Sequence, residues 1–410
     1  MLWICIHGCT EVRRVKSSST QNSMLPSLFL VGVAGSWAPP AFTVDVSKPP
    51  HERWAGAVRT VLDHHGNKLA TGFEAAFTAH NASLFDNLNA STWARLGTAV
   101  QTHYPEQAAE LGTIANELTA AGLPTTFEYL AGWAYFHALA HTELSSDRSP
   151  RACTGVVAQH PTTGAVVHGA NMDQTPPEVR NLTLRVSFVN GSDHLFEGVD
   201  WYWFTTGVSR AVRRGFASVQ ENWRFGSVRA ADVLADVDAG VVPQIWVFRR
   251  AFERLAAAPA ATFDDFAAEM ATVRLAAPYY VIAAGAQSGE GVVITRNTTG
   301  AVATRRLGAA GGGALVQTNY DARDPKEIFD PRRAAAEQTA AEMDAAEVAT
   351  PLGVFAVLST FPVLNPKTAY TAIMAAATGE LHAYVRVPMC PTSRSVVPVP
   401  SGVAPWDGCS

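Results

Sequence analysis

The residues change character at Cys153, and this change constrains the fold more than any other feature of the chain. Before it, residues 39–152 carry apolar side chains at helical spacing, for example over 107–118. After it, short β-branched and apolar runs alternate with turns, as over 182–189 and 279–284. The succession predicts a helical N-terminal part followed by antiparallel strands flanked by helices, which is an α+β layered architecture.

The same periodicities predict further elements downstream of Cys153. Helices are expected over 244–255, 263–272, 332–348 and 352–358, and strands over 155–158, 165–168, 195–198, 291–295, 314–318, 369–375 and 381–387. The polar, proline-containing loop 145–151 separates the two parts and is the kind of segment in which a backbone cut is tolerated.

The length, composition and net charge of the chain exclude several classes of protein. A chain of 410 residues with 48% hydrophobic residues is long enough to build one large or two ordinary domains with a sizeable core. The net charge is −5 and there is no long basic tract, so nucleic acid is not expected as a partner. Because no apolar run reaches about 18 residues, a membrane-spanning helix is not expected.

The first 38 residues divide into a mixed stretch, 1–23, and an apolar stretch, 24–38. The second stretch begins at Met24 and ends in small residues at Ser36 and Ala38, which is the pattern of a cleaved secretory signal. The alternative is a buried apolar segment. The signal interpretation implies that translation starts at Met24.

Two further features agree with secretion. Five Asn-x-Ser/Thr acceptor sites for N-glycans occur at Asn81, Asn89, Asn181, Asn190 and Asn297. A signal cut after residue 38 would remove Cys5 and Cys9 and leave Cys153, Cys390 and Cys409. The last two are candidates for a disulfide in an oxidising compartment, so Cys153 would remain as an unpaired thiol. Such a thiol is either reactive or a small buried hydrophobe.

Four side chains spread along the chain have the chemistry of an amide hydrolase. They are the thiol of Cys153, the carboxylate of Asp173, the amide of Asn319 and the guanidinium of Arg332. If the chain cuts itself before Cys153, the new α-amine can act as the base for the thiol. Without further information, Asp173 and Asn319 are equally well explained as turn residues, and Arg332 as an exposed arginine at the start of a helix.

Several blocks in a fixed order resemble the acid ceramidase and N-acylethanolamine acid amidase family, which are N-terminal-nucleophile hydrolases related to choloylglycine hydrolases. The likeness runs from about Phe42 to Val387. The blocks are TVDV (43–46), PPHERW (49–54), CTGVVAQ (153–159), HGANMD (168–173), QSGEGVVITR (287–296), QTNYD (317–321), DPRR (330–333) and LSTFPVLN (358–365).

The resemblance implies a precursor that is cut between Ala152 and Cys153. Residues 39–152 would remain bound as a small subunit, and residues 153–410 would form a catalytic four-layer αββα sandwich. The expected substrate is a lipid amide, either ceramide or an N-acylethanolamine, met at most through transient contact with a membrane surface. The expected location is the lysosome or outside the cell, and no cofactor or metal is expected.

The resemblance also implies a role for each residue. Cys153 attacks the amide carbonyl to give a thioester, and its α-amine, with an ordinary pKa of about 7.7–8.0, moves the proton to the leaving amine. Asp173 holds the ammonium, and Asn319 donates to the oxyanion, an interaction worth about 3 kcal/mol. Arg332 matches the family's active-site arginine, whose fork can bracket carboxylates.

Three departures from the family pattern leave an alternative open. Ala170 stands where family members have arginine, Trp223 takes the place of a glutamate with Glu221 nearby, and the segment between Tyr135 and Cys153 is longer than the family's. The alternative is a secreted glycoprotein of the same fold that binds lipid without cutting it. A third interpretation, a cytosolic thiol hydrolase that starts at Met1, requires that the acceptor sites carry no glycan.

Two other clusters have both a structural and a functional interpretation. His137 and His141 lie four residues apart on a predicted helix, but no glutamate follows His137, so the metalloprotease motif is absent and a core or surface pair is favoured over a metal site. Residues 201–204 (WYWF) predict an aromatic strand, which either packs in the core or forms a wall for an acyl chain.

Overall fold

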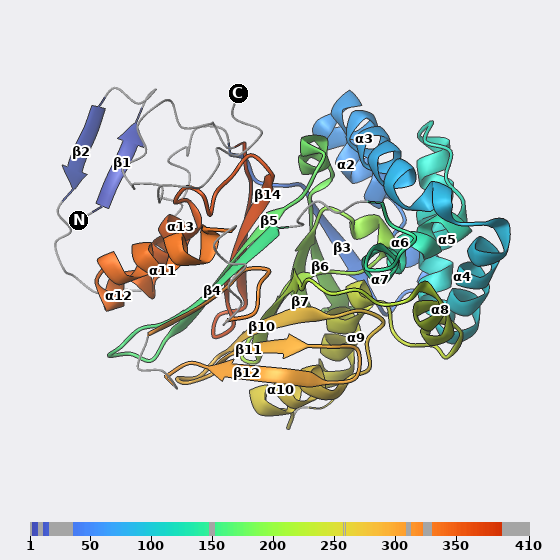
Figure 1. Cartoon of the computed structure of the whole chain (residues 1–410). Helices are drawn as coiled ribbons and strands as arrows, with labels where there is room; N and C mark the ends of the chain where they lie inside the picture. Colours follow the sequence, from blue (N-terminus) through green and yellow to red (C-terminus); the bar gives the residue numbers. More distant parts are fainter. Residues whose placement is uncertain are drawn as a thin grey trace.

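The computed structural model describes residues 2–6, 11–15, 36–146, 152–256, 258, 260–308, 313–322 and 330–387. Most of the predicted signal, residues 24–35, and both cysteines of the predicted disulfide, Cys390 and Cys409, lie outside this part of the chain. Two sheets lie near the centre of the molecule, with helices on either side of them (Figure 1).

The larger sheet contains eight of the described strands in the order β12-β11-β10-β9-β8-β7-β6-β3. Its neighbours are antiparallel except for β3 and β6, which run parallel. The strands are β3 (Ala41–Asp45), β6 (Leu184–Asn190), β7 (Asp193–Asp200), β8 (Arg210–Arg213), β9 (Ala217–Trp223), β10 (Tyr279–Gly285), β11 (Gly291–Arg296) and β12 (Ala301–Arg306).

The smaller sheet contains five strands in the order β13-β4-β5-β14-β15, all antiparallel. They are β4 (Ala152–Gln159), β5 (Val166–Asp173), β13 (Ala314–Gln317), β14 (Thr368–Ala375) and β15 (Glu380–Val385). A separate hairpin pairs β1 (Leu2–Ile6) with β2 (Glu11–Val15).

The two sheets pack face to face through small and apolar side chains. Val157 of the smaller sheet shares a buried cluster with Ile282 and Val293 of the larger one. The sheets approach closely at Gly155, where an added Cβ would lie 2.9 Å from the side chain of Gln220. Glycine at this position therefore allows the close contact.

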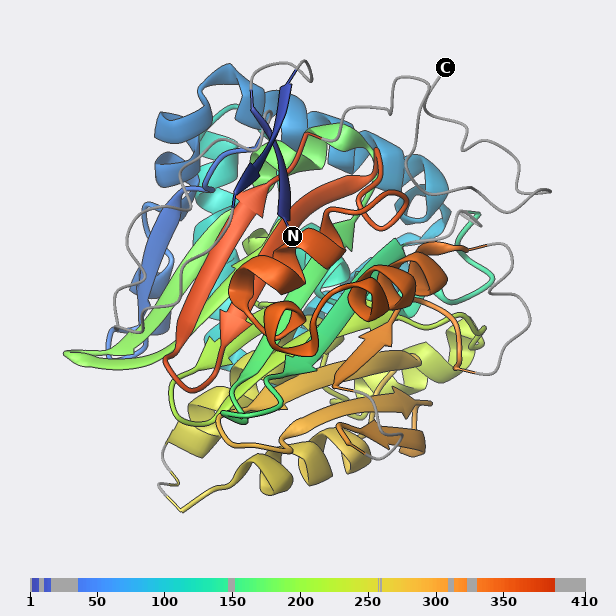
Figure 2. The ribbon, with the colours of Figure 1, turned by 90° about the vertical axis from the view of Figure 1, so that its left-hand side faces the viewer.

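Helices cover the outer face of each sheet. The smaller sheet carries α11 (Arg332–Glu342), α12 (Ala345–Val348) and α13 (Pro351–Leu358), which Figure 2 shows in front of it. The larger sheet carries α9 (Gln244–Ala256) and α10 (Phe263–Thr272). The order helix, sheet, sheet, helix confirms the predicted four-layer αββα architecture.

The segment before Cys153 folds mainly into helices, as predicted. They are α1 (Pro50–Arg53), α2 (Ala57–His65), α3 (Asn67–Ser83), α4 (Ala90–His103), α5 (Pro105–Ala120), α6 (Phe127–Ala134) and α7 (Phe136–Ala140), with a short 3-10 helix, η2 (Phe85–Asn87). The prediction of an entirely helical segment was incomplete, because β3 adds an edge strand to the larger sheet through hydrogen bonds with β6.

Other predictions were wrong in detail. The aromatic stretch 201–204 is a turn leading into the 3-10 helix η4 (Trp203–Thr205), not a strand. The predicted helix 332–348 is interrupted, and the Asp344 side chain accepts from the Ala346 amide to begin α12. The sequence interpretation did not assign β8, β9, β12, α8 (Ala230–Asp238) or the 3-10 helix η3 (Pro177–Leu182).

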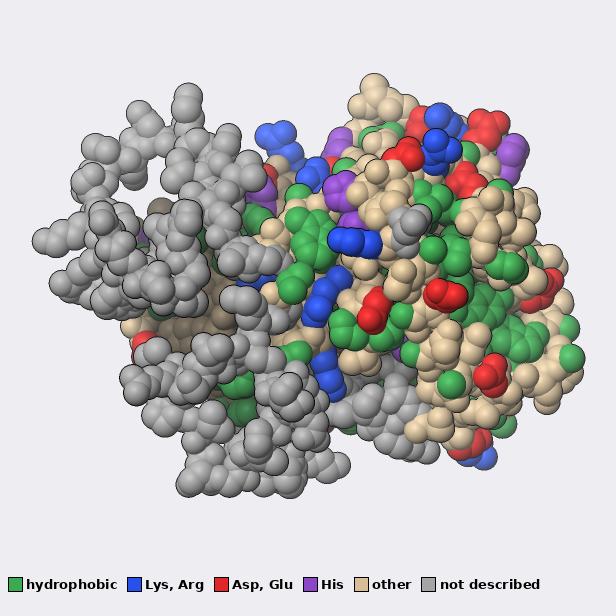
Figure 3. Space-filling view, turned by 90° about the horizontal axis from the view of Figure 1, so that it is seen from above, with side chains coloured by type: hydrophobic (Ala, Val, Ile, Leu, Met, Phe, Trp, Pro, Cys, Tyr) green, Lys and Arg blue, Asp and Glu red, His purple; other side chains and the backbone are tan. Residues whose placement is uncertain are grey.

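Three observations concern the last residues of the predicted signal and the surface of the molecule. Trp37, inside the predicted signal, exchanges backbone hydrogen bonds with Val385 of β15 in the uncut chain. On the face in Figure 3, side chains of both charge signs are spread over the coloured surface. Among the described residues, none of the helices has the length and apolar character needed to cross a membrane.

Candidate active site

Cys153 lies at the beginning of β4, where it pairs with Met172 of β5. Its side chain is 5% exposed and is not in a disulfide. The sulfur is 3.8 Å from the Met172 sulfur and accepts a hydrogen bond of 3.3 Å from Nη2 of Arg210. The thiol is therefore held between the two sheets, next to a buried cation.

The other three predicted site residues lie beside Cys153. Asp173 ends β5, Arg332 begins α11, and Asn319 follows β13. Nη1 of Arg332 donates to the Cys153 carbonyl oxygen at 3.0 Å and to Oδ2 of Asp173 at 3.2 Å. Its Nη2 donates to Oδ1 of Asn319 at 2.9 Å. The structure thus brings all four together, although their chemical roles remain predictions.

Asn319 binds the amide that the predicted cut would release. Its Oδ1 accepts from the Cys153 backbone N–H at 2.8 Å, and its Nδ2 donates to the Trp223 carbonyl at 2.7 Å. In the uncut chain this side chain therefore orients the nitrogen of Cys153. Its Nδ2, which the prediction assigned to the oxyanion, is engaged by Trp223.

Buried polar groups hold the carboxylates of Asp173 and Asp330 in place. Asp173 accepts from Thr368 at 2.6 Å and from Asn365 at 2.8 Å, and Asp330 binds Nε of Arg332 at 2.7 Å. Burial raises the pKa of the Asp173 carboxyl, and Arg332 opposes this by favouring the charged form. Such a fully bonded cluster holds its members in one geometry.

Arg210 was not among the predicted site residues. It lies on β8 opposite Gln220, whose side chain contacts His168 of the other sheet, so both side chains point into the space between the sheets. Burial raises the pKa of the Cys153 thiol, and Arg210 is the strongest opposing influence. The sequence interpretation assigned no element to the segment around Arg210, and no motif in it pointed to Cys153 as a partner.

The position of Arg210 bears on one departure from the family pattern. Ala170 is fully buried on β5 and, like its neighbour His168, lies in the smaller sheet. Burial lowers the pKa of His168 to about 3, and the charge of Arg210 acts in the same direction. A cation therefore reaches this region from the larger sheet, although residue 170 is alanine.

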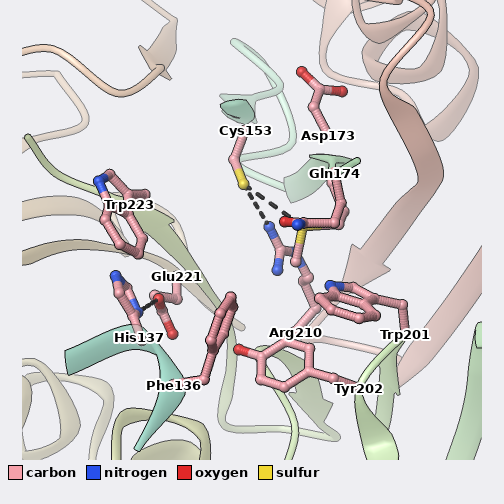
Figure 4. Close-up of a pocket in the computed structure, with 11 residues that line it drawn as sticks. Phe136, His137, Cys153, Asp173, Gln174, Trp201, Tyr202, Arg210, Glu221 and Trp223 are labelled. Carbon is pink, nitrogen blue, oxygen red and sulfur yellow. Dashed lines mark hydrogen bonds and ion pairs between the residues drawn. The ribbon is translucent and has the colours of Figure 1, made fainter. Parts of the chain in front are cut away.

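A pocket opens onto the Cys153 sulfur (Figure 4). In the uncut chain it leaves about 40 Å³ of room for water-sized molecules, which is well below the roughly 300–1,000 Å³ of a usual small-molecule site. Aromatic side chains form much of its wall, namely Phe136, Trp201, Tyr202 and Trp223. All four residues of the stretch 201–204 pack in the core, as the structural interpretation predicted, and Trp201 and Tyr202 also line the pocket. The acyl-chain interpretation stays a prediction.

The two histidines of the predicted helix pair form a stack with Trp223. The Trp223 ring lies 3.7 Å from the His141 ring and 4.3 Å from the His137 ring, centroid to centroid. Nδ1 of His137 also contacts Oε1 of Glu221 on β9. Over the described ranges, no cluster of His, Cys, Asp or Glu side chains has the makings of a metal site, and this pair is a buried stack.

Comparisons with known proteins agree on one group of relatives. No protein-family model matches the chain. An N-acylethanolamine-hydrolyzing acid amidase of Caenorhabditis elegans is 26% identical over 347 residues, covering 83% of this chain and 90% of that protein. The Cavia porcellus protein of the same name is 30% identical over 56% of this chain and 63% of its own length.

Human acid ceramidase is 26% identical over 57% of this chain and 62% of its own length. The chain therefore matches less than two thirds of these two mammalian relatives. A solved structure of the Caenorhabditis elegans amidase ortholog has 29% identity and a TM-score of 0.48, covering 55% of this chain and 93% of that one.

Proposed function

Because the chain belongs to the acid ceramidase and N-acylethanolamine acid amidase family of amide hydrolases, we propose that it hydrolyses the amide bond of N-acylated lipids to a fatty acid and an amine. The observation that carries the proposal is the unpaired Cys153 thiol, which accepts from Arg210 at the edge of a pocket and whose backbone nitrogen is bound by Asn319. The substrate is either a ceramide or an N-acylethanolamine.

Activation would begin with attack of the Cys153 sulfur on the carbonyl carbon of Ala152. The C–N bond of that peptide breaks, a C–S bond forms, and the thiol proton passes to the Cys153 nitrogen. Water then cleaves the thioester, which leaves a carboxylate on Ala152 and a free amine on Cys153. The hydrogen bond from this nitrogen to Asn319 supports the step, because the amine would be formed in an already oriented position.

The mature site would use the same sulfur on the lipid amide. The α-amine accepts the thiol proton, the thiolate adds to the carbonyl carbon, and the protonated amine gives its proton to the leaving nitrogen. Water hydrolyses the acyl thioester to release the fatty acid and restore the thiol. Arg210 favours the thiolate, since a neighbouring cation stabilises the charged form.

Asp173 and Arg332 would act on the amine as a unit. Arg332 contacts both the Asp173 carboxylate and the Cys153 carbonyl oxygen. This arrangement supports a role for Asp173 in balancing the charge of the ammonium group while Arg332 fixes the backbone of the nucleophile. We expect the Asp173→Asn variant to lose activity, because its amide can accept from Thr368 but its nitrogen, a donor, would face Nδ2 of Asn365 and Nη1 of Arg332, which also donate.

Incubation of purified precursor at acidic pH tests the proposal. Two fragments should appear on a denaturing gel, mass spectrometry should identify Cys153 as a new N-terminus, and the Cys153→Ala variant should stay intact. The mature protein should then release fatty acid from a ceramide or an N-acylethanolamine. A chain that remains intact and releases no fatty acid from either lipid contradicts the proposal.

The lipid-binding alternative is favoured by two departures from the family pattern, Ala170 in place of an arginine and Trp223 in place of a glutamate. A protein of this kind would bind either lipid with measurable affinity and remain uncut. Its affinity for the lipid would be the same in the wild type and in Cys153→Ala. Incubating each lipid with the wild type and with Cys153→Ala separates the two proposals. A hydrolase consumes the lipid in the wild type and only binds it in Cys153→Ala, whereas a lipid-binding protein leaves it intact in both.

We further propose that the protein enters the secretory route and acts in the lysosome or outside the cell. The acceptor residues Asn89 and Asn190 are exposed, so they are accessible to glycosylation. A fall in apparent mass after glycosidase treatment of protein from a eukaryotic host is the expected result. Unglycosylated protein in the cytosol would instead favour the thiol hydrolase that starts at Met1.

A further inference from the structure

The hydrogen-bonded ladder between β13 and β4 ends just before the candidate active site. Its last pair joins Gln317 to Gly155, and Asn319 and Cys153 each lie two residues beyond that pair. They are joined instead by the hydrogen bond from the Cys153 backbone N–H to Oδ1 of Asn319. Contacts from outside this ladder therefore decide where the backbone at Asn319 lies.

Strand β9 of the larger sheet supplies such contacts through Asn222, which is fully buried. Nδ2 of Asn222 donates to the carbonyl oxygen of Gln317 at 3.0 Å and, less closely, to that of Thr318 at 3.4 Å. Because the Gln317 side chain also donates to the Thr318 oxygen, the bond to Gln317 is the one that depends on Asn222. The next residue of β9, Trp223, accepts from Nδ2 of Asn319 at 2.7 Å. Two neighbouring residues of β9 thus hold the backbone before Asn319 and the side chain of Asn319.

A chain of buried side chains fixes the orientation of the Asn222 amide. Burial lowers the pKa of His168 to about 3, so its ring is neutral and carries one proton. Since Oε1 of Gln220 only accepts, Nε2 of His168 donates to it at 3.0 Å, and Nδ1 accepts from the Ser218 hydroxyl at 3.1 Å. Nε2 of Gln220 in turn donates to Oδ1 of Asn222 at 2.5 Å, which directs Nδ2 of Asn222 towards β13. Such a bonded chain resists a change of geometry.

The position of Asn319 bears directly on the proposed chemistry. Its Oδ1 orients the Cys153 nitrogen, which would take up a proton when the peptide bond breaks and would act as the base afterwards. A shift of the end of β13 would move Asn319 and change how this nitrogen is held relative to the carbonyl under attack. Misplacement of a reacting group by about 1 Å can slow a reaction about a hundredfold.

We propose that Asn222 is a positioning residue for the cut before Cys153 and for the hydrolysis of the lipid. Its amide binds between the sheets, whereas Glu221 and Trp223 of the same strand line the pocket. Asn222 therefore acts through the backbone that carries Asn319. The inference rests on the proposed function, because the reaction that Asn222 positions is the proposed one.

The rate of the cut tests this role. Asn222→Leu has nearly the same size, but it removes the donor and leaves the Gln317 carbonyl oxygen unpaired. Precursor purified at neutral pH is acidified, and the fragments are quantified on a denaturing gel over time. We expect the rate constant of the cut to fall at least about tenfold. A fraction of unfolded molecules would lower the final extent of cutting and not its rate constant, so misplacement and loss of fold give different results.

The cut form provides a second readout. In mature Asn222→Leu, kcat for the lipid amide should fall at least about tenfold while KM stays near the wild-type value, because Asn222 binds the end of β13 and not the substrate. Damage to the pocket would raise KM instead.

Arg296→Met is the matched control. Arg296 lies on β11 of the same sheet, is also fully buried, and donates to two backbone carbonyl oxygens, those of Met270 and Val273. Both carbonyls belong to the end of α10, away from the residues around Cys153. The variant should lower the melting temperature and leave the rate constant of the cut unchanged.

Thermal unfolding shows whether each variant is folded. If Asn222→Leu does not fold, Asn222→Ser takes its place, because its hydroxyl still donates one hydrogen bond. The rate constant of Asn222→Ser should also lie below that of the wild type.

Each result has a distinct meaning. If the wild type is cut and the folded Asn222 variant is cut at the same rate, the positioning role is wrong and the amidase stands. The positioning role is also wrong if Arg296→Met is slowed as much as the Asn222 variant, or if KM rises while kcat is unchanged. A wild type that is neither cut nor active on either lipid contradicts the proposed function itself, and the positioning role with it.

Discussion

Replacing Arg210 by methionine should make the Cys153 thiol much less reactive. Nη2 of Arg210 lies 3.3 Å from the sulfur, and the arginine is only 1% exposed, so solvent ions screen the interaction little. A charge pair at about 4 Å in a protein environment interacts with about 4 kcal/mol. Since about 1.4 kcal/mol corresponds to a factor of ten, the loss of thiolate is up to about a thousandfold.

The assay is alkylation of Cys153 by iodoacetamide as a function of pH, with the modified peptide quantified by mass spectrometry. Below the pKa of the thiol, the rate follows the fraction of thiolate. Removing the cation raises this pKa, so the profile of Arg210→Met should shift to higher pH and its rate at neutral pH should fall at least tenfold. Arg210→Lys keeps a positive charge, so its alkylation profile should lie between those of the wild type and Arg210→Met.

A matched control comes from the same strand. The guanidinium of Arg213 on β8 lies over the Phe216 ring, 5.3 Å from its centre, so Arg213→Met should alkylate like the wild type. Thermal unfolding confirms that each variant is folded. An unchanged pH profile in folded Arg210→Met would refute the idea that this guanidinium stabilises the thiolate.

Three further outcomes follow from the packing of the site. Arg332→Met should lower the free energy of unfolding by about 3–5 kcal/mol in a denaturant titration, because Asp173 and Asp330 lose their buried cation, whereas the exposed Arg229→Met should change it by less than about 0.5 kcal/mol. Gly155→Ala should lower the melting temperature, since its Cβ would lie 2.9 Å from Gln220; an unchanged melting temperature would show that the sheets can separate there. Burial lowers the pKa of His168 to about 3, so between about pH 3 and 6.5 its imidazole is protonated in the unfolded chain but not in the folded one. The free energy of unfolding should therefore fall by up to about 1.4 kcal/mol per pH unit as the pH drops below about 6.5. His168→Gln should reduce this slope, and an equal slope in wild type and variant would contradict the assignment.

Local patterns predicted the architecture because burial imposes a period on the sequence. The alternation of apolar residues after Cys153 and their helical spacing before it reflect one buried face on each element, so they can be read without the tertiary structure. The grouping of the candidate site residues was predictable for a different reason. Cys153, Asp173, Asn319 and Arg332 stand in blocks whose order resembles a known family, and the structure places them in contact.

Where local patterns failed, tertiary contacts overrode them. The stretch 201–204 has strand-like composition, but the Asp200 side chain accepts from the backbone amides of Trp201 and Tyr202 and stabilises a turn instead. The edge strand β3 depends on pairing with β6, about 140 residues away in sequence. Short strands of this kind gain their stability from a partner and not from their own composition.

The sequence by itself indicated helices before Cys153 and layered strands and helices after it, because burial sets the spacing of apolar residues, and its resemblance to a known family predicted the four layers and the role of Cys153. Only the tertiary structure decided what surrounds Cys153. Arg210 reaches the Cys153 sulfur from the opposite sheet, and His137 of the helical segment meets Glu221 of a strand. These pairs form where separate layers pack together, and nothing in the local period of a chain specifies which side chains will face each other across that space.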